Sequence, residues 1–180
     1  MANRIISFKE FSPSSGKQYF FDTNIWMLLY CPLGNVKKEK QDKASKLFSY
    51  ILSANVPIIL TSLILAEFSN AYLRLAFEQW RKLPENVSGK FKINYFDTTD
   101  ASANREAISS AINNMLNINL IQKFPDNFHN INLSNILTNY KTIDFNDSFI
   151  IESCIKNSWI LVTDDGDFNK IDFGISIVNL

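Results

Sequence analysis

Residues 20–26, Phe20-Phe21-Asp22-Thr23-Asn24-Ile25-Trp26, contain the pattern that decides the fold. An apolar run from Tyr19 ends on the carboxylate of Asp22, and after two more polar residues a second apolar run begins. A short apolar run interrupted in this way is typical of a buried strand leading into a turn or helix. In an open α/β sheet, ligands bind where a strand gives way to its helix. Asp22 therefore either caps the next helix, since Asp is a favoured N-cap, or belongs to a binding site.

Length, charge and cysteine content limit the class of protein. The chain has 180 residues, 46% of them hydrophobic, which predicts a single domain over residues 1–180. With 18 basic and 18 acidic residues the formal net charge is zero, so any nucleic-acid contact has to come from a local patch. Cys31 and Cys154 lack metal-type spacing and are expected to be reduced core thiols. We expect a cytoplasmic protein with no signal peptide and no membrane span.

Short apolar runs alternate with helical patterns along most of the chain. Ser62 and Asp144 are expected to cap two of the helices. Strands that alternate with helices indicate a parallel sheet in an α/β layer fold. The expected strands are 17–21, 56–61, 159–163 and 175–178, and the expected helices are 25–30, 37–53, 62–83, about 98–117 and 144–157.

The segment 84–141 is harder to assign. Residues 91–96 alternate as a strand does but also fit an extended connection, and residues 133–140 form a short helical pattern. We interpret 84–141 as an inserted helical and loop segment or lid. The only histidine, His129, lies in this segment and is expected at the surface, which excludes a ribonuclease mechanism that depends on histidine.

Acidic residues follow three of the expected strands. Glu67 lies in an otherwise apolar stretch of its helix, where a buried site residue and a solvent-facing or salt-bridged glutamate are both open. Asp147 shares the apolar face of the last helix by its spacing. Because the carboxyl ends of parallel strands meet at one rim, all of these side chains are expected to converge there. The residues that follow the strands are Asp22, Glu67, Asp164, Asp165 and Asp167.

Converging carboxylates without nearby lysines repel one another, which raises their pKa values or recruits a cation. Oxygen ligands of this kind suit Mg²⁺ or Mn²⁺, and the lack of cysteine or histidine at these positions does not favour zinc. A divalent ion held by carboxylates suits phosphodiester hydrolysis, because it activates water and neutralises charge on phosphate.

The sequence resembles the PIN domain family of metal-dependent ribonucleases, in four stretches that follow in the expected order. They are Phe21-Asp22-Thr23-Asn24, Ser62 with Glu67, Asp147-Ser148, and Leu161-Val162-Thr163-Asp164-Asp165-Gly166-Asp167-Phe168. The resemblance implies a three-layer α/β sandwich with a central parallel sheet and an Mg²⁺ or Mn²⁺ site. It implies that metal is held and a water positioned to cut RNA by Asp22, Glu67, Asp147 and Asp165, with Asp167 as a further ligand. Asn24, Thr163 and Asp164 match supporting positions, and either Asp164 or Asp165 could face the metal.

Small bacterial PIN proteins that resemble VapC-type toxins pair with an antitoxin and form dimers. The resemblance therefore implies an RNA substrate, an antitoxin protein as partner and a homodimer. The segment 84–141 is longer than in compact toxins, and it could instead shape a different RNA groove. Arg74 follows Glu67 on the same helix face, where it either contacts RNA phosphate or is a solvated or salt-bridged arginine.

Two other classes of function fit the acidic rim less well. A phosphatase with an aspartate nucleophile would need a second aspartate where this chain has Asn24, and neither it nor a phospho-acceptor domain explains Glu67. A non-catalytic scaffold that binds RNA or protein is the remaining alternative, and the presence of all four acids argues against it.

Overall fold

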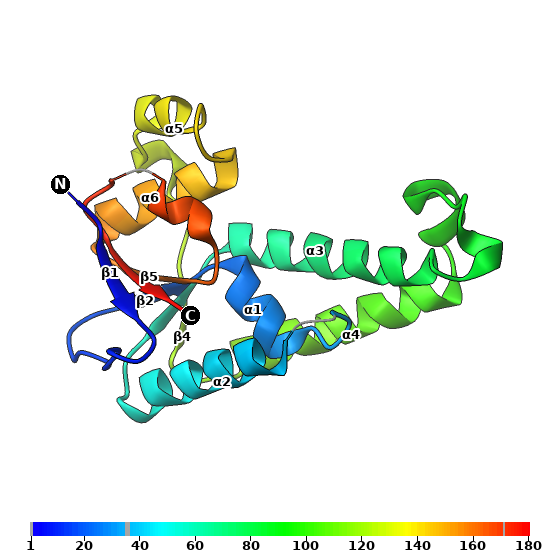
Figure 1. Ribbon diagram of the computed structural model, residues 1–180, viewed down its shortest axis with the longest axis horizontal. Helices are drawn as coiled ribbons and strands as arrows, with labels where there is room; N and C mark the ends of the chain where they lie inside the picture. The colour runs from blue at the N-terminus through cyan, green and yellow to red at the C-terminus, as the bar shows by residue number, and fades with distance from the viewer. Residues whose placement is uncertain (1, 35–36, 171) are drawn as a thin grey trace.

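The computed structural model describes residues 2–34, 37–170 and 172–180 (Figure 1). The strands are β1 (Arg4–Ser7), β2 (Tyr19–Phe21), β3 (Ile58–Leu60), β4 (Ile121–Lys123), β5 (Ile160–Thr163) and β6 (Ser176–Asn179). The α-helices are α1 (Thr23–Tyr30), α2 (Lys38–Ser53), α3 (Ser62–Trp80), α4 (Thr99–Leu116), α5 (Leu133–Asn139) and α6 (Phe145–Asn157). Short helical turns are η1 (Pro84–Asn86), η2 (Phe91–Tyr95), η3 (Phe128–Asn130) and η4 (Gly166–Asn169).

The six strands form one parallel sheet in the order β1-β6-β5-β2-β3-β4. Figure 1 shows α5 and α6 on one side of the sheet and α1 and α2 on the other, which confirms the predicted three-layer α/β fold. Strand β2 lies at the centre, where Phe21 pairs with Val162 of β5 and Phe20 with Ile59 of β3. The residues that follow β2, β3 and β5 are therefore neighbours at one rim.

Aromatic side chains fill the core on both sides of β2. Phe20 stacks on Trp159, with ring centroids 5.4 Å apart and planes 9° apart. On the opposite side Phe21 contacts Trp26 and Phe48. Because side chains of successive strand residues point to opposite faces, the two phenylalanines fill the core on opposite faces of β2, and Phe21 packs the strand against α1 and α2. The residue after them, Asp22, is thereby fixed at the rim.

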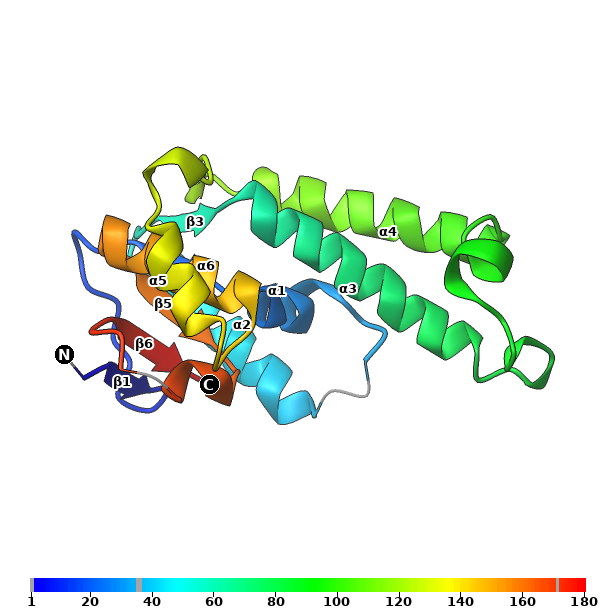
Figure 2. The same ribbon diagram turned by 90° about the horizontal axis from the view of Figure 1, so that it is seen from above.

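Helices α3 and α4 lie side by side and extend beyond the sheet as an arm (Figures 1 and 2). The end of the arm has its own small apolar cluster of Ala76, Phe77, Tyr95 and Ala101. Residues 91–96 were predicted to be a strand or an extended connection. They instead form the π-helical turn η2, in which Phe91 and Tyr95 pack against Phe77.

Three details differ from the sequence predictions. The cap of α3 is Thr61, whose hydroxyl accepts from the Ile64 amide at 3.5 Å, and the Ser62 hydroxyl donates to Asp126 instead. Part of the expected insertion, 84–141, is the edge strand β4, so this part belongs to the sheet. Strand β1 was not predicted. Asp144 caps α6 as predicted, accepting from the Asp147 amide at 2.9 Å.

None of the helices in the described part of the chain is long and apolar enough to cross a bilayer. Cys31 and Cys154 are both buried and unpaired with each other, as the sequence predicted for core thiols.

Candidate metal centre

Asp22 occupies the N-cap position of α1, but its side chain does not cap that helix. Its Oδ2 atom instead accepts hydrogen bonds from the Thr163 hydroxyl at 2.8 Å and the Asn24 amide at 2.5 Å. The side chain is 5% exposed. Of the two roles open for Asp22, capping is therefore excluded.

Thr163, the last residue of β5, connects the ends of the two central strands. Besides donating to Asp22, its buried hydroxyl accepts from the Asn24 side-chain amide and from the Asp165 backbone amide, both at 3.0 Å. The Asn24 side-chain carbonyl accepts from the backbone amide of Asp164 at 3.2 Å. Asn24 and Thr163 thus fix both the Asp22 carboxylate and the loop that follows β5.

Glu67 faces the same rim from the second turn of α3. Its carboxylate accepts from the Thr23 hydroxyl at 2.7 Å, which ties α3 to α1. Partial burial raises the pKa of Glu67, and hydrogen bonds with Thr23 and Asn146 oppose that rise. The glutamate is half-buried and forms no salt bridge within the described part of the chain, and its role in a metal site stays a prediction.

Three aspartates come together where α6 meets the loop after β5. One carboxylate oxygen from each of Asp147, Asp165 and Asp167 lies within 4.8 Å of the other two. Asp165 also accepts from the Asp167 backbone amide at 2.8 Å, and Asp167 pairs with Lys170 at 2.8 Å. Oxygen atoms at this spacing can share one divalent cation.

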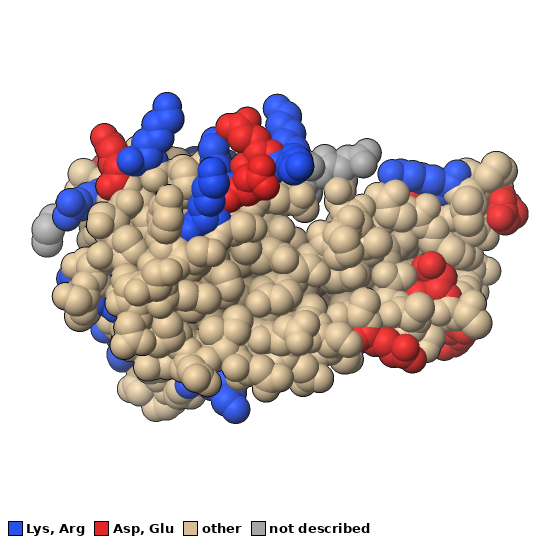
Figure 3. All heavy atoms as spheres, turned by 90° about the horizontal axis from the view of Figure 1, so that it is seen from below, with Lys and Arg blue, Asp and Glu red and all other residues tan. Residues whose placement is uncertain are grey.

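Asp164 turns away from these three aspartates. Its carboxylate pairs with Lys40 of α2 at 2.5 Å, so Asp165 is the residue of this loop that faces the cluster. Lys37 and Lys40 line the same pocket as the carboxylates, and both are exposed to solvent. Figure 3 shows side chains of both charges gathered along one edge of the molecule, with little charge over most of the visible face.

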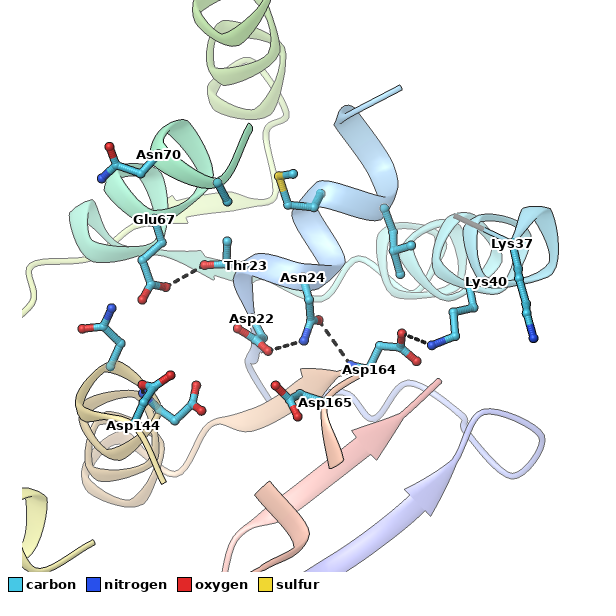
Figure 4. Close-up of a pocket in the computed structure, with 15 residues that line it drawn as sticks. Asp22, Thr23, Asn24, Lys37, Lys40, Glu67, Asn70, Asp144, Asp164 and Asp165 are labelled. Atoms are coloured by element: carbon cyan, nitrogen blue, oxygen red, sulfur yellow. Dashed lines mark hydrogen bonds and ion pairs between the residues drawn. The ribbon is translucent and has the colours of Figure 1, made fainter. Parts of the chain in front are cut away.

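The pocket that contains the carboxylates measures about 940 Å³. Figure 4 shows Asp22, Glu67, Asp144 and Asp165 around one hollow, with Lys37 and Lys40 to one side. The four carboxylates come from four parts of the chain: the β2–α1 junction, α3, the start of α6 and the loop after β5. Asp147 also lines the hollow. The rim predicted from the strand ends is therefore present as one cavity.

The carboxylates oppose one another electrostatically. Burial raises the pKa of Asp22 to about 6, with smaller contributions from the negative charges of Glu67 and Asp165. Burial and then the charges of Asp144, Asp22, Asp165 and Glu67 raise the pKa of Asp147 to about 8. A positive ion among them would reverse both effects. The donor set is all carboxylate oxygen, which fits Mg²⁺ or Mn²⁺.

Several pocket residues were not predicted. Thr23, Asn70, Asp144 and Asn146 line the cavity together with Lys37, which precedes α2, and Lys40 of α2. Thr23 stands between the two polar residues on which the prediction rested, so its position beside Asp22 could have identified it. Arg74 is not among the residues that line the cavity. It is exposed and lies over the Phe91 ring, 4.4 Å from its centroid, so its contact with RNA stays a prediction.

Comparison with known families identifies the fold. The PIN domain model matches residues 19–174, which include every strand from β2 to β5 and all the carboxylates of the pocket. The chain belongs to the PIN domain family. PIN domains are in general nucleases of the hydrolase class. No curated protein sequence matches the chain.

Among solved structures, the PIN fold of this chain is similar to a crystal structure of VapBC2 from Rickettsia felis bound to a DNA fragment from their promoter. The TM-score is 0.51 at 18% sequence identity, and the match covers 89% of this chain and 98% of that one. At this identity the likeness extends to the fold alone.

Proposed function

We propose that this PIN domain is an Mg²⁺- or Mn²⁺-dependent endoribonuclease that cleaves RNA phosphodiesters in the cytoplasm. The observation that carries the proposal is the convergence of Asp22, Glu67, Asp147 and Asp165 on one cavity, with the pKa values of Asp22 and Asp147 raised. A structural role does not require this costly arrangement, because buried like charges destabilise the fold unless a cation neutralises them.

Asp22, Asp147 and Asp165 would hold the ion, with Glu67 and Asp167 completing the set. The ion, when bound, supplies an activated water and neutralises charge that develops on the phosphate. Asn24 and Thr163 orient Asp22 by donating to its Oδ2 atom. Asp164 supports the site indirectly, since it holds Lys40 at the edge of the pocket.

The two lysines provide a local group of positive charges, although the chain as a whole has no net positive charge. Lys37 and Lys40 line the cavity beside the carboxylates, where an RNA strand that reaches the metal passes them. Their ammonium groups bind phosphate electrostatically, and this term dominates the affinity of most proteins for nucleic acids. A local basic patch of this kind is what a chain of zero net charge needs to bind RNA.

We further propose that the chain is the toxin of a toxin–antitoxin pair, with an antitoxin protein as partner and a homodimer as the assembly. The support is the fold that it shares with the VapBC2 structure over nearly the whole length of that chain. Co-expression with the product of the adjacent gene, followed by co-purification, tests the antitoxin.

The nuclease proposal is tested with Asp22→Asn and Asp147→Asn. Both variants should stay folded and lose cleavage of RNA in Mn²⁺ by at least about 100-fold, the scale of loss when an electrostatic catalytic element is removed. Asp97→Asn, an exposed carboxylate on the arm, is the matched control and should cleave at the parent rate. Unchanged cleavage by either pocket variant refutes the site. A parent protein that binds RNA but does not cleave it would be a scaffold.

A further inference from the structure

A second hollow of about 290 Å³ adjoins the metal pocket between the starts of α3 and α6. Asn146 lines both hollows. On α3, Leu63 of the second hollow lies one turn before Glu67 of the first, and on α6 Phe145 lies two residues before Asp147. The two hollows therefore adjoin at Asn146, and we call the pair the groove, with the metal pocket as its carboxylate end and the second hollow as its apolar end.

The apolar end presents aromatic rings to solvent. Phe128 is 60% exposed and Phe145 is 39% exposed, and both line the hollow beside the buried ring of Phe149. The rings of Phe128 and Phe149 are almost parallel, at 12°, with centroids 6.5 Å apart. Large exposed apolar side chains gathered in a hollow, as opposed to scattered singly, mark a binding surface.

The charges along the groove indicate which part of a nucleotide each end can take. The described residues that line the apolar end include no lysine or arginine, and their one charged residue is Asp126, which accepts from Ser62. This end is thus unfavourable for phosphate and favourable for a flat, uncharged ring. The lysines Lys37 and Lys40 lie on the far side of Asp22 from Asp144, as Figure 4 shows.

We propose that the apolar end of the groove binds the base of a nucleotide next to the cleaved phosphate, stacked on Phe128. The inference rests on the proposed nuclease function, and it requires that the base bound at this position be unpaired. A base paired within a duplex is stacked between its neighbours and cannot enter the hollow, whereas bases of single strands stack readily on aromatic side chains.

The test measures binding of fluorescent single-stranded oligoribonucleotides to the whole protein in Ca²⁺, with the RNA verified as intact on a gel. Phe128→Ala should weaken binding roughly 10-fold, within the range for removal of one stacking platform. Phe128→Trp keeps a stacking surface and should bind as the parent does. Tyr50→Ala is the matched control, since Tyr50 is 50% exposed but lies outside both hollows.

A set of oligonucleotides, each with one abasic position, separates stacking from general damage. One abasic position should weaken binding to the parent by a similar factor, and at this position Phe128→Ala should cause no further loss, because the two changes remove the same contact. Parent-like RNA binding by Phe128→Ala overturns the inference and leaves the groove to an apolar protein partner. Equal loss on every abasic RNA also overturns it.

Failure of the base subsite can be distinguished from failure of the nuclease. If the parent does not cleave in Mn²⁺ but binding depends on Phe128 and on one base, the nuclease proposal fails and the base-binding site is supported. If the parent cleaves and Phe128→Ala binds and cleaves equally well, the subsite fails alone.

Discussion

Replacing Asp147 with asparagine should stabilise the metal-free protein at alkaline pH. Among the described residues, no donor forms a hydrogen bond with the Asp147 carboxylate, and burial followed by four neighbouring carboxylates raises its pKa to about 8. Asparagine has nearly the same volume but no charge. The substitution therefore removes the cost of burying the Asp147 charge and the repulsion between this charge and the neighbouring carboxylates. It opens no cavity, and no neighbouring donor loses a partner.

The size of the effect follows from the pKa. A rise of the Asp147 pKa from 3.8 to about 8 would correspond to a loss of about 6 kcal/mol in the free energy of unfolding if the group were fully buried. Asp147 is partly exposed, so solvent screening reduces this to about 2–3 kcal/mol. For a chain of this size the melting temperature should then rise by about 5–10 °C.

The sign of the pH dependence is set by proton binding. Between pH 4 and 8 the folded state holds a proton on Asp147 that the unfolded state has lost, so the stability of the parent falls as the pH rises. The loss of folding stability caused by the Asp147 charge is complete above pH 8 and disappears near pH 4. The advantage of Asp147→Asn over the parent should therefore grow from small at pH 4.5 to its full value at pH 8.5.

Urea unfolding in EDTA at these two pH values measures the difference in free energy of unfolding. Asp97→Asn, outside the pocket on the arm, controls for general loss of negative charge. The reasoning is refuted if Asp147→Asn is no more stable than the parent at pH 8.5, or if its advantage is as large at pH 4.5. Either result would mean that the carboxylates of the rim do not repel one another as their positions require.

Three further predictions concern the metal, the lysine beside the pocket and the arm. Millimolar Mn²⁺ should raise the melting temperature of the parent more at pH 8 than at pH 6, because the ion competes with protons at Asp22 and its neighbours; equal shifts would contradict this. Lys40→Gln should reduce the slope of log affinity for single-stranded RNA against log salt by about 0.7, whereas Lys43→Gln, on the same helix but outside the pocket, should not. In Gly89→Ala the new Cβ would lie 2.4 Å from the Trp80 ring. Urea unfolding should therefore show a loss of about 1–3 kcal/mol in the free energy of unfolding, while cleavage is retained. Unchanged stability would show that the ring moves freely.

The central sheet and the rim were predictable because their signals are local. Strand β2 is a short apolar run and β5 is apolar up to Thr163, and each strand is followed at once by an acidic residue. Asp144 was placed correctly as the cap of α6 for the same reason, since capping depends on residues three positions apart. Local patterns of this kind need no knowledge of the rest of the chain.

Which aspartate of the β5 loop faces the cluster was not predictable. Asp164 and Asp165 are neighbours of the same chemistry, and the choice is made by Lys40, which lies 124 residues away from Asp164 in the sequence. The face of α2 that carries Lys40 looks like an ordinary solvated surface in the sequence. Only the tertiary fold reveals that it ends at the pocket.

The edge of the sheet was missed for a related reason. Strand β4 has one buried residue, Ile121, followed by exposed Gln122 and Lys123. Such a run carries little hydrophobic periodicity, and its position is set by pairing with β3. Residues 91–96 show the opposite error, because they alternate in polarity as a strand does, yet Phe91 and Tyr95 pack onto one end of the arm in a π-helical turn.

The identity of residue 24 explains why this rim suits a metal better than a covalent phosphate. Asn24 donates to the same Asp22 oxygen that Thr163 reaches, and its own carbonyl accepts from the backbone of Asp164. An aspartate here would have no amide proton to donate and would place a second negative charge next to Asp22. Asn24 and Thr163 together therefore fix Oδ2 of Asp22 without adding a negative charge beside it, which suits the proposed cation site. In an aspartate phosphatase the partner acid would instead have to carry a proton, and this chain has no acid in that position.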